Sequence, residues 1–184
     1  MMIDLIETEK RLLEKHIVSG GTAVDFTMGN GHDTLWLSRA VGPEGKVYAF
    51  DIQRQALEKT EELLKKEGAF ENVRLILDSH ANAEQYVKEP VCAGMFNLGW
   101  LPGGDKSVTT RLESTMTALR AAVSLLAPDG AILLAVYPGH EEGRKEGEAV
   151  EQYLSSLNRR EICCSKFEIV NSPTSPFFFL IEKK

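Results

Sequence analysis

The hydrophobic residues of this chain follow two spacings, which alternate from the N-terminus to the C-terminus. Short apolar runs, such as residues 22–26 and 131–137, are bounded by glycine, proline or aspartate. Between them lie longer charged stretches in which apolar residues recur at helical spacing, as in residues 109–126. Compact apolar runs are typical of buried strands, and the helical spacing is typical of amphipathic helices. The chain therefore predicts strands and helices in alternation.

The bounds of these elements follow from the apolar patterns and from the turn-forming residues between them. The predicted helices cover residues 2–18, 32–40, 53–67, 81–87, 109–126 and 142–157. The predicted strands cover residues 22–26, 46–50, 73–77, 91–98, 131–137, 161–170 and 176–182. The turns expected between them include Gly20-Gly21, Gly42–Gly45 and Pro128–Gly130.

This order of elements predicts an α/β fold of the Rossmann-like type. Strands that alternate with helices form a mostly parallel sheet with helices on both faces. Residues 171–175 are too short for a crossover connection, so the last two of the seven strands should be antiparallel. A chain of 184 residues suits one such domain, expected over residues 1–184. The N-terminal helix, within residues 1–20, should pack on the sheet.

Composition narrows the class of protein. The net charge of −6 disfavours broad binding to nucleic acid, although it leaves room for an RNA substrate held by a local basic patch. No apolar run approaches the roughly 20 residues of a membrane helix, so no membrane partner is expected. The three cysteines lack metal-ligand spacing, which favours reduced thiols in the cytoplasm and no metal site. The basic pairs Lys106/Arg111 and Arg144/Lys145 are candidates for a local patch, but such pairs are more often solvated surface.

The segment from Ala23 to Thr34 carries the clearest chemistry. Gly29 and Gly31 follow a predicted strand and allow the backbone to approach a ligand closely. Asp51 ends the next strand, where a carboxylate can accept hydrogen bonds from ribose hydroxyls. Ligands of open α/β sheets bind beyond the carboxyl ends of the strands. These residues therefore predict a cofactor that contains adenosine.

Three residues favour S-adenosylmethionine over a nicotinamide dinucleotide. A dinucleotide fingerprint has a third glycine where this chain has Thr34. Asp33 opens the following helix and would repel a pyrophosphate. Asp25 at the strand end can bind the ammonium group of the methionine moiety. The residues alone thus indicate a methyltransferase.

Further strand ends supply more candidate cofactor contacts. Asp78 can reach the adenine amino group, and Gln53 can reach the ribose edge. Ser79 and His80 either contact the ligand or cap the next helix, and the same alternative holds for His32. The full set of predicted cofactor-binding residues is Asp25, Thr27, Gly29, Asn30, Gly31, His32, Asp33, Asp51, Gln53, Asp78, Ser79, His80 and Asn97.

The methyl acceptor is expected beside the fourth and fifth predicted strands. The amide oxygen of Asn97 can accept a hydrogen bond from an attacking amine and orient its lone pair. Trp100 can stack on a planar base or act as a hydrophobic lid. Tyr137 and His140 follow the fifth strand; His140 can remove a proton from the substrate or only contact it. Asn97 and His140 are the predicted catalytic residues, and Trp100, Tyr137 and His140 the predicted substrate contacts.

Four motifs resemble those of a family of small bacterial class I methyltransferases once labelled "putative rRNA methylase". They are Asp25-x-Thr27-x-Gly-Asn-Gly-His-Asp-Thr34, Asn97-Leu-Gly-Trp-Leu-Pro-Gly-Gly-Asp-Lys106, Tyr137-Pro-Gly-His140 and the closing Pro-Phe-Phe-Phe-Leu-Ile-Glu-Lys183. The resemblance covers nearly the whole chain. That family usually has tyrosine in place of Trp100, which favours an aromatic platform over hydroxyl chemistry at this position.

The resemblance implies a specific reaction. The family includes the tRNA methyltransferase that converts 5-aminomethyl-(2-thio)uridine at the wobble position to its 5-methylaminomethyl form. It implies that the tRNA anticodon region is the substrate, that the nucleophile is a primary amine, and that the protein is a homodimer. Methylation of ribosomal RNA or of a small-molecule amine is the alternative. A noncatalytic adenosine binder is disfavoured, because Asp25, Gly29, Gly31, Asp51 and Asn97 are all present.

Overall fold

A computed structural model describes residues 5–101, 103, 109–139 and 141–184. For Ile6, within the first range, it describes the backbone but not the side chain. Its helices are α1 (Leu5–Glu14), α2 (His32–Val41), α3 (Arg54–Lys66), the 3-10 helix η1 (His80–Asn82), α4 (Ala83–Tyr86), α5 (Leu112–Leu125) and α6 (Glu141–Ser155). Its strands are β1 (Thr22–Asp25), β2 (Lys46–Asp51), β3 (Val73–Leu77), β4 (Val91–Asn97), β5 (Leu126–Val136), β6 (Ile162–Phe167) and β7 (Phe177–Lys183).

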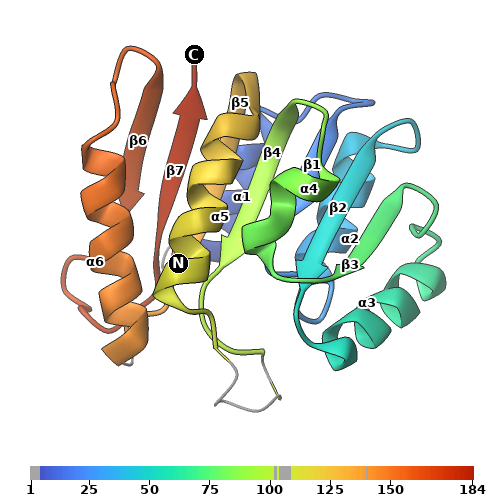
Figure 1. Cartoon of the computed structure of the whole chain (residues 1–184), viewed down its shortest axis with the longest axis horizontal. Helices are drawn as coiled ribbons and strands as arrows, with labels where there is room; N and C mark the ends of the chain where they lie inside the picture. The colour runs from blue at the N-terminus through green and yellow to red at the C-terminus, as the bar shows by residue number, and fades with distance from the viewer. Residues whose placement is uncertain (1–4, 102, 104–108, 140) are drawn as a thin grey trace.

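The seven strands form one sheet in the order β3-β2-β1-β4-β5-β7-β6 (Figure 1). The pairs among β1 to β5 are parallel, whereas β7 runs antiparallel to both β5 and β6. The chain order reverses between β1 and β4, which is the switch point where open α/β sheets bind their ligands. The predicted fold class, with its antiparallel C-terminal strand, is confirmed.

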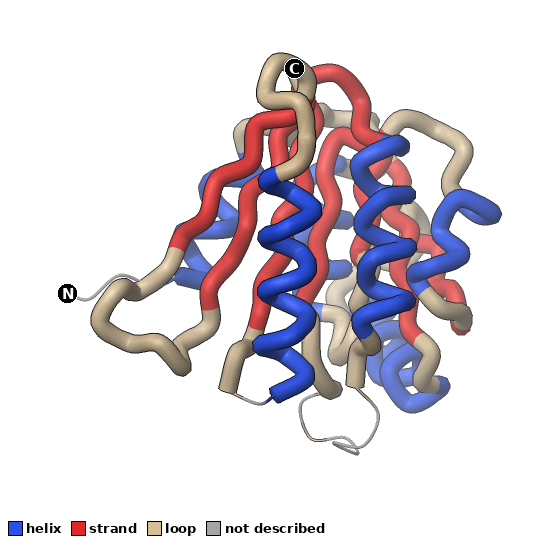
Figure 2. Tube along the Cα trace, turned by 60° about the vertical axis from the view of Figure 1, so that its left-hand side comes forward, coloured by secondary structure: helices blue, strands red, loops and turns tan. Residues whose placement is uncertain are grey.

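Helices cover both faces of the sheet, as the rotated view makes clear (Figure 2). On one face α4, α5 and α6 enclose a core in which Phe26 stacks on Phe96, with ring centroids 4.1 Å apart. On the other face α1 and α2 pack on residues such as Leu133 and Leu180. α1 contacts β5 and β7, as expected for the N-terminal helix. Alternate side chains of each central strand thus enter different cores.

The N-terminal helix is shorter than residues 2–18. Among the described residues it ends at Glu14, and the next two residues form a turn in which His16 N donates to the carbonyl of Leu13. The ring of His16 lies 2.7 Å (Nδ1) from the Asp129 carbonyl and 3.4 Å (Nε2) from Glu182. His16 therefore ties the end of α1 to β5 and β7.

The start of β5 is also corrected. The predicted helix 109–126 and turn 128–130 are replaced by a shorter α5 and a strand that begins at Leu126. Its pairing with β4 is irregular, because Val91 faces Leu126 whereas Ala93 faces Ala131. Asp129 has φ of 60°, so the turn signal in the sequence corresponds to a bulge within the strand. At the C-terminus, β6 likewise ends at Phe167 and not at residue 170.

Candidate active site

A cavity of about 800 Å³ lies at the carboxyl ends of the parallel strands, beside the switch point. Its volume is in the range of small-molecule sites. Of the predicted site residues, all that are described line it except Asp25 and Gly31. His140 lies outside the described residues. The lining comprises Glu9, Lys10, Phe26–Asn30, His32, Asp33, Phe50–Gln53, Asp78–His80, Asn97–Leu101, Thr109–Arg111, Ser114 and Tyr137.

Asp25 holds the cofactor loop through hydrogen bonds and does not line the cavity. Its side chain is fully buried. One carboxylate oxygen accepts a hydrogen bond from Thr27 N at 3.1 Å, and the other accepts one from Thr34 Oγ1 at 2.6 Å. Burial and the nearby charge of Asp33 raise the pKa of Asp25 to about 7. The expected direct contact with a ligand ammonium therefore gives way to a structural role, and Thr34 acts as its partner.

The two loop glycines differ in what a β-carbon would meet at each position. Gly31 has φ of 83°, and a β-carbon there would lie 2.7 Å from Thr60 Oγ1 and 3.0 Å from Thr60 Cα. Gly29 has φ of 53°, but its β-carbon would meet only ordinary contacts, the nearest 3.6 Å away. Thr60 Oγ1 also donates to the carbonyl of Gly29 at 3.1 Å. Gly31 thus admits helix α3, a correction to the expectation that it admits a ligand.

Asp51 connects the end of β2 to the same loop. Its oxygens accept hydrogen bonds from Gly29 N at 3.1 Å and from Gln53 N at 2.9 Å. Burial raises the pKa of this carboxyl above its ordinary value, and the backbone amides of Gln53, Gly29 and Ile52 act in the opposite direction. Each carboxylate oxygen keeps lone-pair capacity toward the cavity that it lines. This arrangement suits a ligand that donates two hydroxyl groups.

The end of β3 combines helix capping with cavity lining. Asp78 accepts hydrogen bonds from Ser79 N, Asn82 Nδ2 and Tyr86 Oη, and the Tyr86 hydroxyl is the leading cause of the lowered pKa of Asp78. Ser79 Oγ caps η1 by accepting from Ala81 N at 3.2 Å. For Ser79 the capping role is thus present together with a place in the cavity wall.

His80 is buried at the same strand end. Its Nδ1 lies 3.0 Å from the carbonyl of Phe26, so Nδ1 must carry the proton that it donates. Burial lowers the pKa of His80 below its ordinary value, which favours the neutral ring. Within the described part of the chain, Nε2 is buried and has no hydrogen-bond partner. His80 therefore lines the cavity as a neutral ring whose buried Nε2 carries no proton.

His32 and Gln53 stand at the starts of α2 and α3. His32 is exposed, and the N-cap of α2 is Gly31, with no side-chain cap. Gln53 is the N-cap of α3, and its side chain makes no capping hydrogen bond. Both side chains line the cavity without a capping role.

The far end of the cavity, here called the acceptor end, is built by Glu9, Lys10, Asp33, Asn97 and Tyr137. Lys10 Nζ lies 2.7 Å from Asp33 Oδ1, and Asn97 Nδ2 donates to Asp33 Oδ2 at 2.8 Å. Because Lys10 pairs with Asp33, the expected repulsion between Asp33 and a pyrophosphate is reduced. Asp33 therefore disfavours a pyrophosphate less than its position in the sequence suggested.

Tyr137 faces the acidic side of the acceptor end. Its side chain is 38% exposed, and burial, followed by the charges of Glu9 and Asp33, raises the pKa of its hydroxyl. The hydroxyl therefore remains protonated at neutral pH. It can donate a hydrogen bond to a substrate, which agrees with the predicted contact role.

Trp100 begins a loop whose two ends are held together. Thr110 N donates to the Gly99 carbonyl and Gly99 N donates to Thr110 Oγ1, both at 2.9 Å. Thr110 Oγ1 in turn donates to the buried carboxylate of Glu146 on α6 at 2.8 Å. Trp100 is 37% exposed and lines the cavity.

Several lining residues were missed in the sequence. Glu9 and Lys10 belong to α1, which was expected only to pack on the sheet, and no local motif marks them. Ile52 is 59% exposed directly after Asp51, and it gives the cavity an apolar surface beside the ribose position. An apolar residue exposed next to a strand-end carboxylate could have been suspected as a surface for a base.

The candidate basic pairs separate in the structure. Arg144 pairs with Glu148, and Lys145 pairs with Glu141 and Glu142 along α6, so this pair is a solvated helix face. Arg111 lines the cavity, whereas Lys106 lies outside the described residues.

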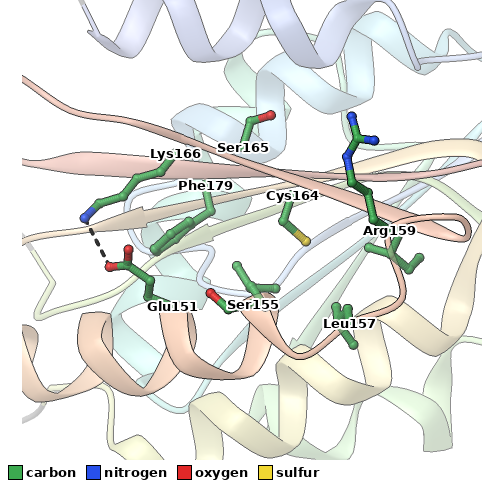
Figure 3. A pocket seen from close by; sticks show the side chains of 10 residues that line it. Glu151, Ser155, Leu157, Arg159, Cys164, Ser165, Lys166 and Phe179 are labelled. Carbon is green, nitrogen blue, oxygen red and sulfur yellow. Dashed lines mark hydrogen bonds and ion pairs between the residues drawn. The ribbon is translucent and has the colours of Figure 1, made fainter.

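A second cavity, of about 300 Å³, lies between α6 and the edge strand β6 (Figure 3). The Lys166 ammonium there pairs with Glu151 at 3.1 Å and with Glu168 at 2.9 Å. Desolvation is the leading cause of the raised pKa of Cys164, about 11, which keeps that thiol protonated. Its lysine is thus paired and its thiol protonated, and the first cavity remains the candidate site.

Within the described ranges no group of three or more His, Cys, Asp or Glu side chains could hold a metal ion. None of the helices described is long and apolar enough to cross a membrane.

The first cavity fits the predicted cofactor. An adenosine needs an acceptor for its ribose hydroxyls, an apolar surface for its base and polar groups at the base edge. Asp51, Ile52 and the Asp78–His80 segment provide these in a row along the ends of β2 and β3. The methionine moiety would then lie against the loop from Thr27 to Asp33.

Comparisons with known proteins identify the family. The model described as "Putative rRNA methylase" matches residues 47–183. The chain is 41% identical to "tRNA (mnm(5)s(2)U34)-methyltransferase, chloroplastic" of Arabidopsis thaliana, over 93% of this chain and 66% of that protein. It spans less than two thirds of the length of each of the first curated relatives that it matches.

Two crystal structures are similar over the full length of both chains. One is a putative rRNA methylase from Clostridium thermocellum, with 35% identity and a TM-score of 0.97. The other is a putative methyltransferase from Streptococcus mutans in complex with SAH, with 37% identity and a TM-score of 0.90. The predicted family, enzyme class and cofactor are confirmed: the chain belongs to the family described as "Putative rRNA methylase" and is an S-adenosylmethionine-dependent methyltransferase.

Proposed function

We propose that this enzyme methylates the amine of 5-aminomethyl-(2-thio)uridine at the wobble position of tRNA, which gives the 5-methylaminomethyl form. The observation that carries the proposal is the acceptor end, where the Asn97 amide donates to Asp33 and keeps its oxygen for another partner. An amine is the kind of nucleophile that such an acceptor oxygen orients. The Arabidopsis relative, named as a tRNA wobble-uridine methyltransferase, supports the same substrate.

The residues of the chain have distinct tasks in this reaction. The cofactor supplies an electrophilic methyl group on a sulfonium. Asn97 Oδ1 accepts a hydrogen bond from the neutral amine and directs its lone pair to the methyl carbon; Trp100 stacks on the uracil, and Tyr137 donates to the substrate. Leu98 and Leu101, both buried and lining the cavity, exclude water. His140 is the proposed acceptor of the proton that the ammonium must lose before attack.

The cofactor contacts follow the order of the strand ends. Asp51 and Gln53 bind the ribose, Asp78, Ser79 and His80 bind the adenine edge, and the loop from Thr27 through Asn30 to His32 and Asp33 surrounds the methionine moiety. Asp25 and Gly31 support that loop from outside the cavity. All of these residues belong to one methyltransferase domain over residues 1–184.

The setting of the enzyme is proposed from the family and from its thiols. Three free cysteines, Cys92, Cys163 and Cys164, suit the reducing cytoplasm. The family resemblance suggests a homodimer that binds the anticodon region of tRNA.

The test is methylation of tRNA that carries the aminomethyl group. Purified enzyme with S-adenosylmethionine should convert the aminomethyl nucleoside of such tRNA to its methylaminomethyl form, measured by nucleoside mass spectrometry. tRNA lacking the aminomethyl group and ribosomal RNA should remain unmethylated. Equal transfer to unmodified transcripts, or transfer only to ribosomal RNA or to small amines, would overturn the proposal. In a deletion strain, the aminomethyl precursor should accumulate.

A further inference from the structure

We propose that Lys10 and Asp33 are positioning residues that fix the Asn97 amide with its oxygen toward the methyl acceptor. This inference rests on the proposed amine substrate and adds a role for helix α1 that neither the motifs nor the family match assigns. Three interacting side chains form this arrangement: Lys10 of α1, Asp33 of α2 and Asn97 at the end of β4.

Close contacts connect the three side chains in order. Lys10 Nζ lies 2.7 Å from Asp33 Oδ1, and Asp33 Oδ2 accepts a hydrogen bond from Asn97 Nδ2 at 2.8 Å. The two charged side chains are only 24% and 20% exposed, so water screens their interaction less than it screens a surface pair. Each oxygen of the Asp33 carboxylate thus has a different partner.

The partner of Asn97 determines which way its amide faces. A carboxylate accepts hydrogen bonds and cannot donate them, so the NH₂ group of Asn97 must point to Asp33. The amide oxygen then lies on the opposite side of the group. No described residue donates a hydrogen bond to this oxygen, and Asn97 lines the cavity. The oxygen is therefore left to accept from the substrate amine.

The backbone of Asn97 is fixed as well. Its N–H donates to Thr27 Oγ1 at 2.7 Å, which ties the end of β4 to the cofactor loop. With the main chain held by Thr27 and the side chain held by Asp33, the amide can turn only by breaking a contact. This matters because a turned amide would present its NH₂ group to the substrate. That group would donate to the lone pair with which the substrate amine must attack the methyl carbon.

Lys10 holds Asp33 in the orientation that Asn97 needs. Because Lys10 pairs with Asp33 Oδ1, the other oxygen, Oδ2, is left to accept from Asn97 Nδ2. The Lys10 ammonium also lies 5.8 Å from the centre of the Trp36 ring, a further contact that holds it in place. Without this pair the Asp33 carboxylate could rotate away from Asn97, and the orientation of the amide would then be lost.

The decisive experiment measures whether Lys10 acts through Asn97. Turnover of aminomethyl-bearing tRNA is compared for wild type, Lys10→Met, Asn97→Ala and the double variant. A one-ångström misplacement of a reacting group can cost about 100-fold, so Lys10→Met should lower kcat by about 10- to 100-fold with little change in KM for tRNA. In the Asn97→Ala background the same substitution should change kcat less than about twofold. Equal factors in both backgrounds would overturn the inference.

Three further variants separate positioning from folding. Lys10→Arg keeps the charge and should retain most of the wild-type kcat. Asp33→Asn is nearly isosteric but can donate as well as accept, so it should lower kcat without unfolding the chain. Lys46→Met removes a surface salt bridge of similar length, 2.6 Å to Glu89. Lys46 is the first residue of β2, at the opposite end of the strand from Asp51 and the cavity, so this variant should leave kcat unchanged. Loss of kcat in Asp33→Asn equal to that in Lys46→Met would contradict the proposal.

A binding measurement keeps this test independent of tRNA. Sinefungin is a cofactor analogue that carries an amine on carbon where the cofactor carries its methyl on sulfur. Wild type should bind sinefungin more tightly than S-adenosylhomocysteine, and Lys10→Met and Asp33→Asn should lose this preference in calorimetry. The same preference in all variants would overturn the inference. If wild type fails to methylate tRNA but the preference follows Lys10 and Asp33, only the proposed substrate is wrong.

Discussion

The two ends of the cavity are constructed differently. At the cofactor end, the loop from Thr27 to Gly31 is held by side chains that bind its backbone, such as Asp51 on Gly29 N and Thr60 on Gly29 O. At the acceptor end, side chains from α1, α2, the end of β4 and the residue after β5 meet, and they hold one another by charge and hydrogen bonding. One end depends on backbone shape and the other on side-chain identity.

This difference indicates where each end tolerates change. A loop defined by its backbone can keep binding the same cofactor while neighbouring side chains vary. An end assembled from side chains can be adapted to a different methyl acceptor by one or two substitutions. The conservative cofactor end and the adaptable acceptor end together explain how one fold serves different substrates.

The largest effect that would test this comparison is expected from Asp51→Ala. It removes the carboxylate that holds Gly29 N and that is proposed to accept the ribose hydroxyls. Hydrogen bonds to charged groups contribute about 1.5–3 kcal/mol each, so cofactor affinity should fall about 100-fold. Calorimetric titration with S-adenosylhomocysteine measures it.

The matched control removes a surface carboxylate, that of Glu67, which lies in the same half of the sequence as Asp51. Glu67→Ala breaks the 2.6 Å ion pair with Arg39 and should leave cofactor affinity unchanged. Unaltered affinity in Asp51→Ala would show that the ribose does not lie at the end of β2. It would also remove the main distinction between the two ends.

A second prediction tests whether the cofactor loop is limited by helix packing. Gly31→Ala places a β-carbon 2.7 Å from Thr60, whereas Gly68→Ala has a similar φ of 65° with nothing within 4 Å. The strain of positive φ is therefore common to both variants, and the collision occurs only in the first. We expect Gly31→Ala to lower the free energy of unfolding by about 2 kcal/mol more than Gly68→Ala. Denaturant titration of both variants gives the comparison, and equal losses would contradict it.

The sequence predicted the cofactor end well because its signals are local. The glycines, Asp25 and Asp51 lie at strand ends whose positions follow from apolar runs, and parallel strands bring these ends to one edge. The details still differed: Gly31 makes room for Thr60, and Asp25 supports the loop from below. Neither fact has a local signal, because both depend on which helix packs on which loop.

The acceptor end was predicted only in part. Asn97 and Tyr137 follow strands and could be placed, but Lys10 and Glu9 lie on a helix that looked like a packing element. Pairing between residues 10 and 33 depends on where α1 crosses α2, and no spacing rule predicts that. For the same reason the bulge that begins β5 appeared in the sequence as a turn.

The last expected effect, the smallest when counted per pH unit, concerns the pH dependence of the fold and comes from Asp25. Its folded-state pKa of about 7 lies above the ordinary value of 3.8, so the folded chain binds the proton more tightly than the unfolded chain. Between those two values the free energy of unfolding must fall as pH rises, by up to about 1.4 kcal/mol per pH unit from this group, and the fall ends above its folded pKa.

Asp25→Asn should remove that slope, because the amide does not titrate; its oxygen can still accept from Thr27 N while its NH₂ group donates to the Thr34 hydroxyl. Denaturant titrations at about pH 5 and about pH 7 give the slope for each protein, and Glu113→Gln on exposed α5 controls for the loss of one negative charge. A wild-type slope that persists in Asp25→Asn would assign it to other carboxyls. It would also mean that the buried support of the cofactor loop is ionised, so that the cofactor end, like the acceptor end, would depend on a buried charge.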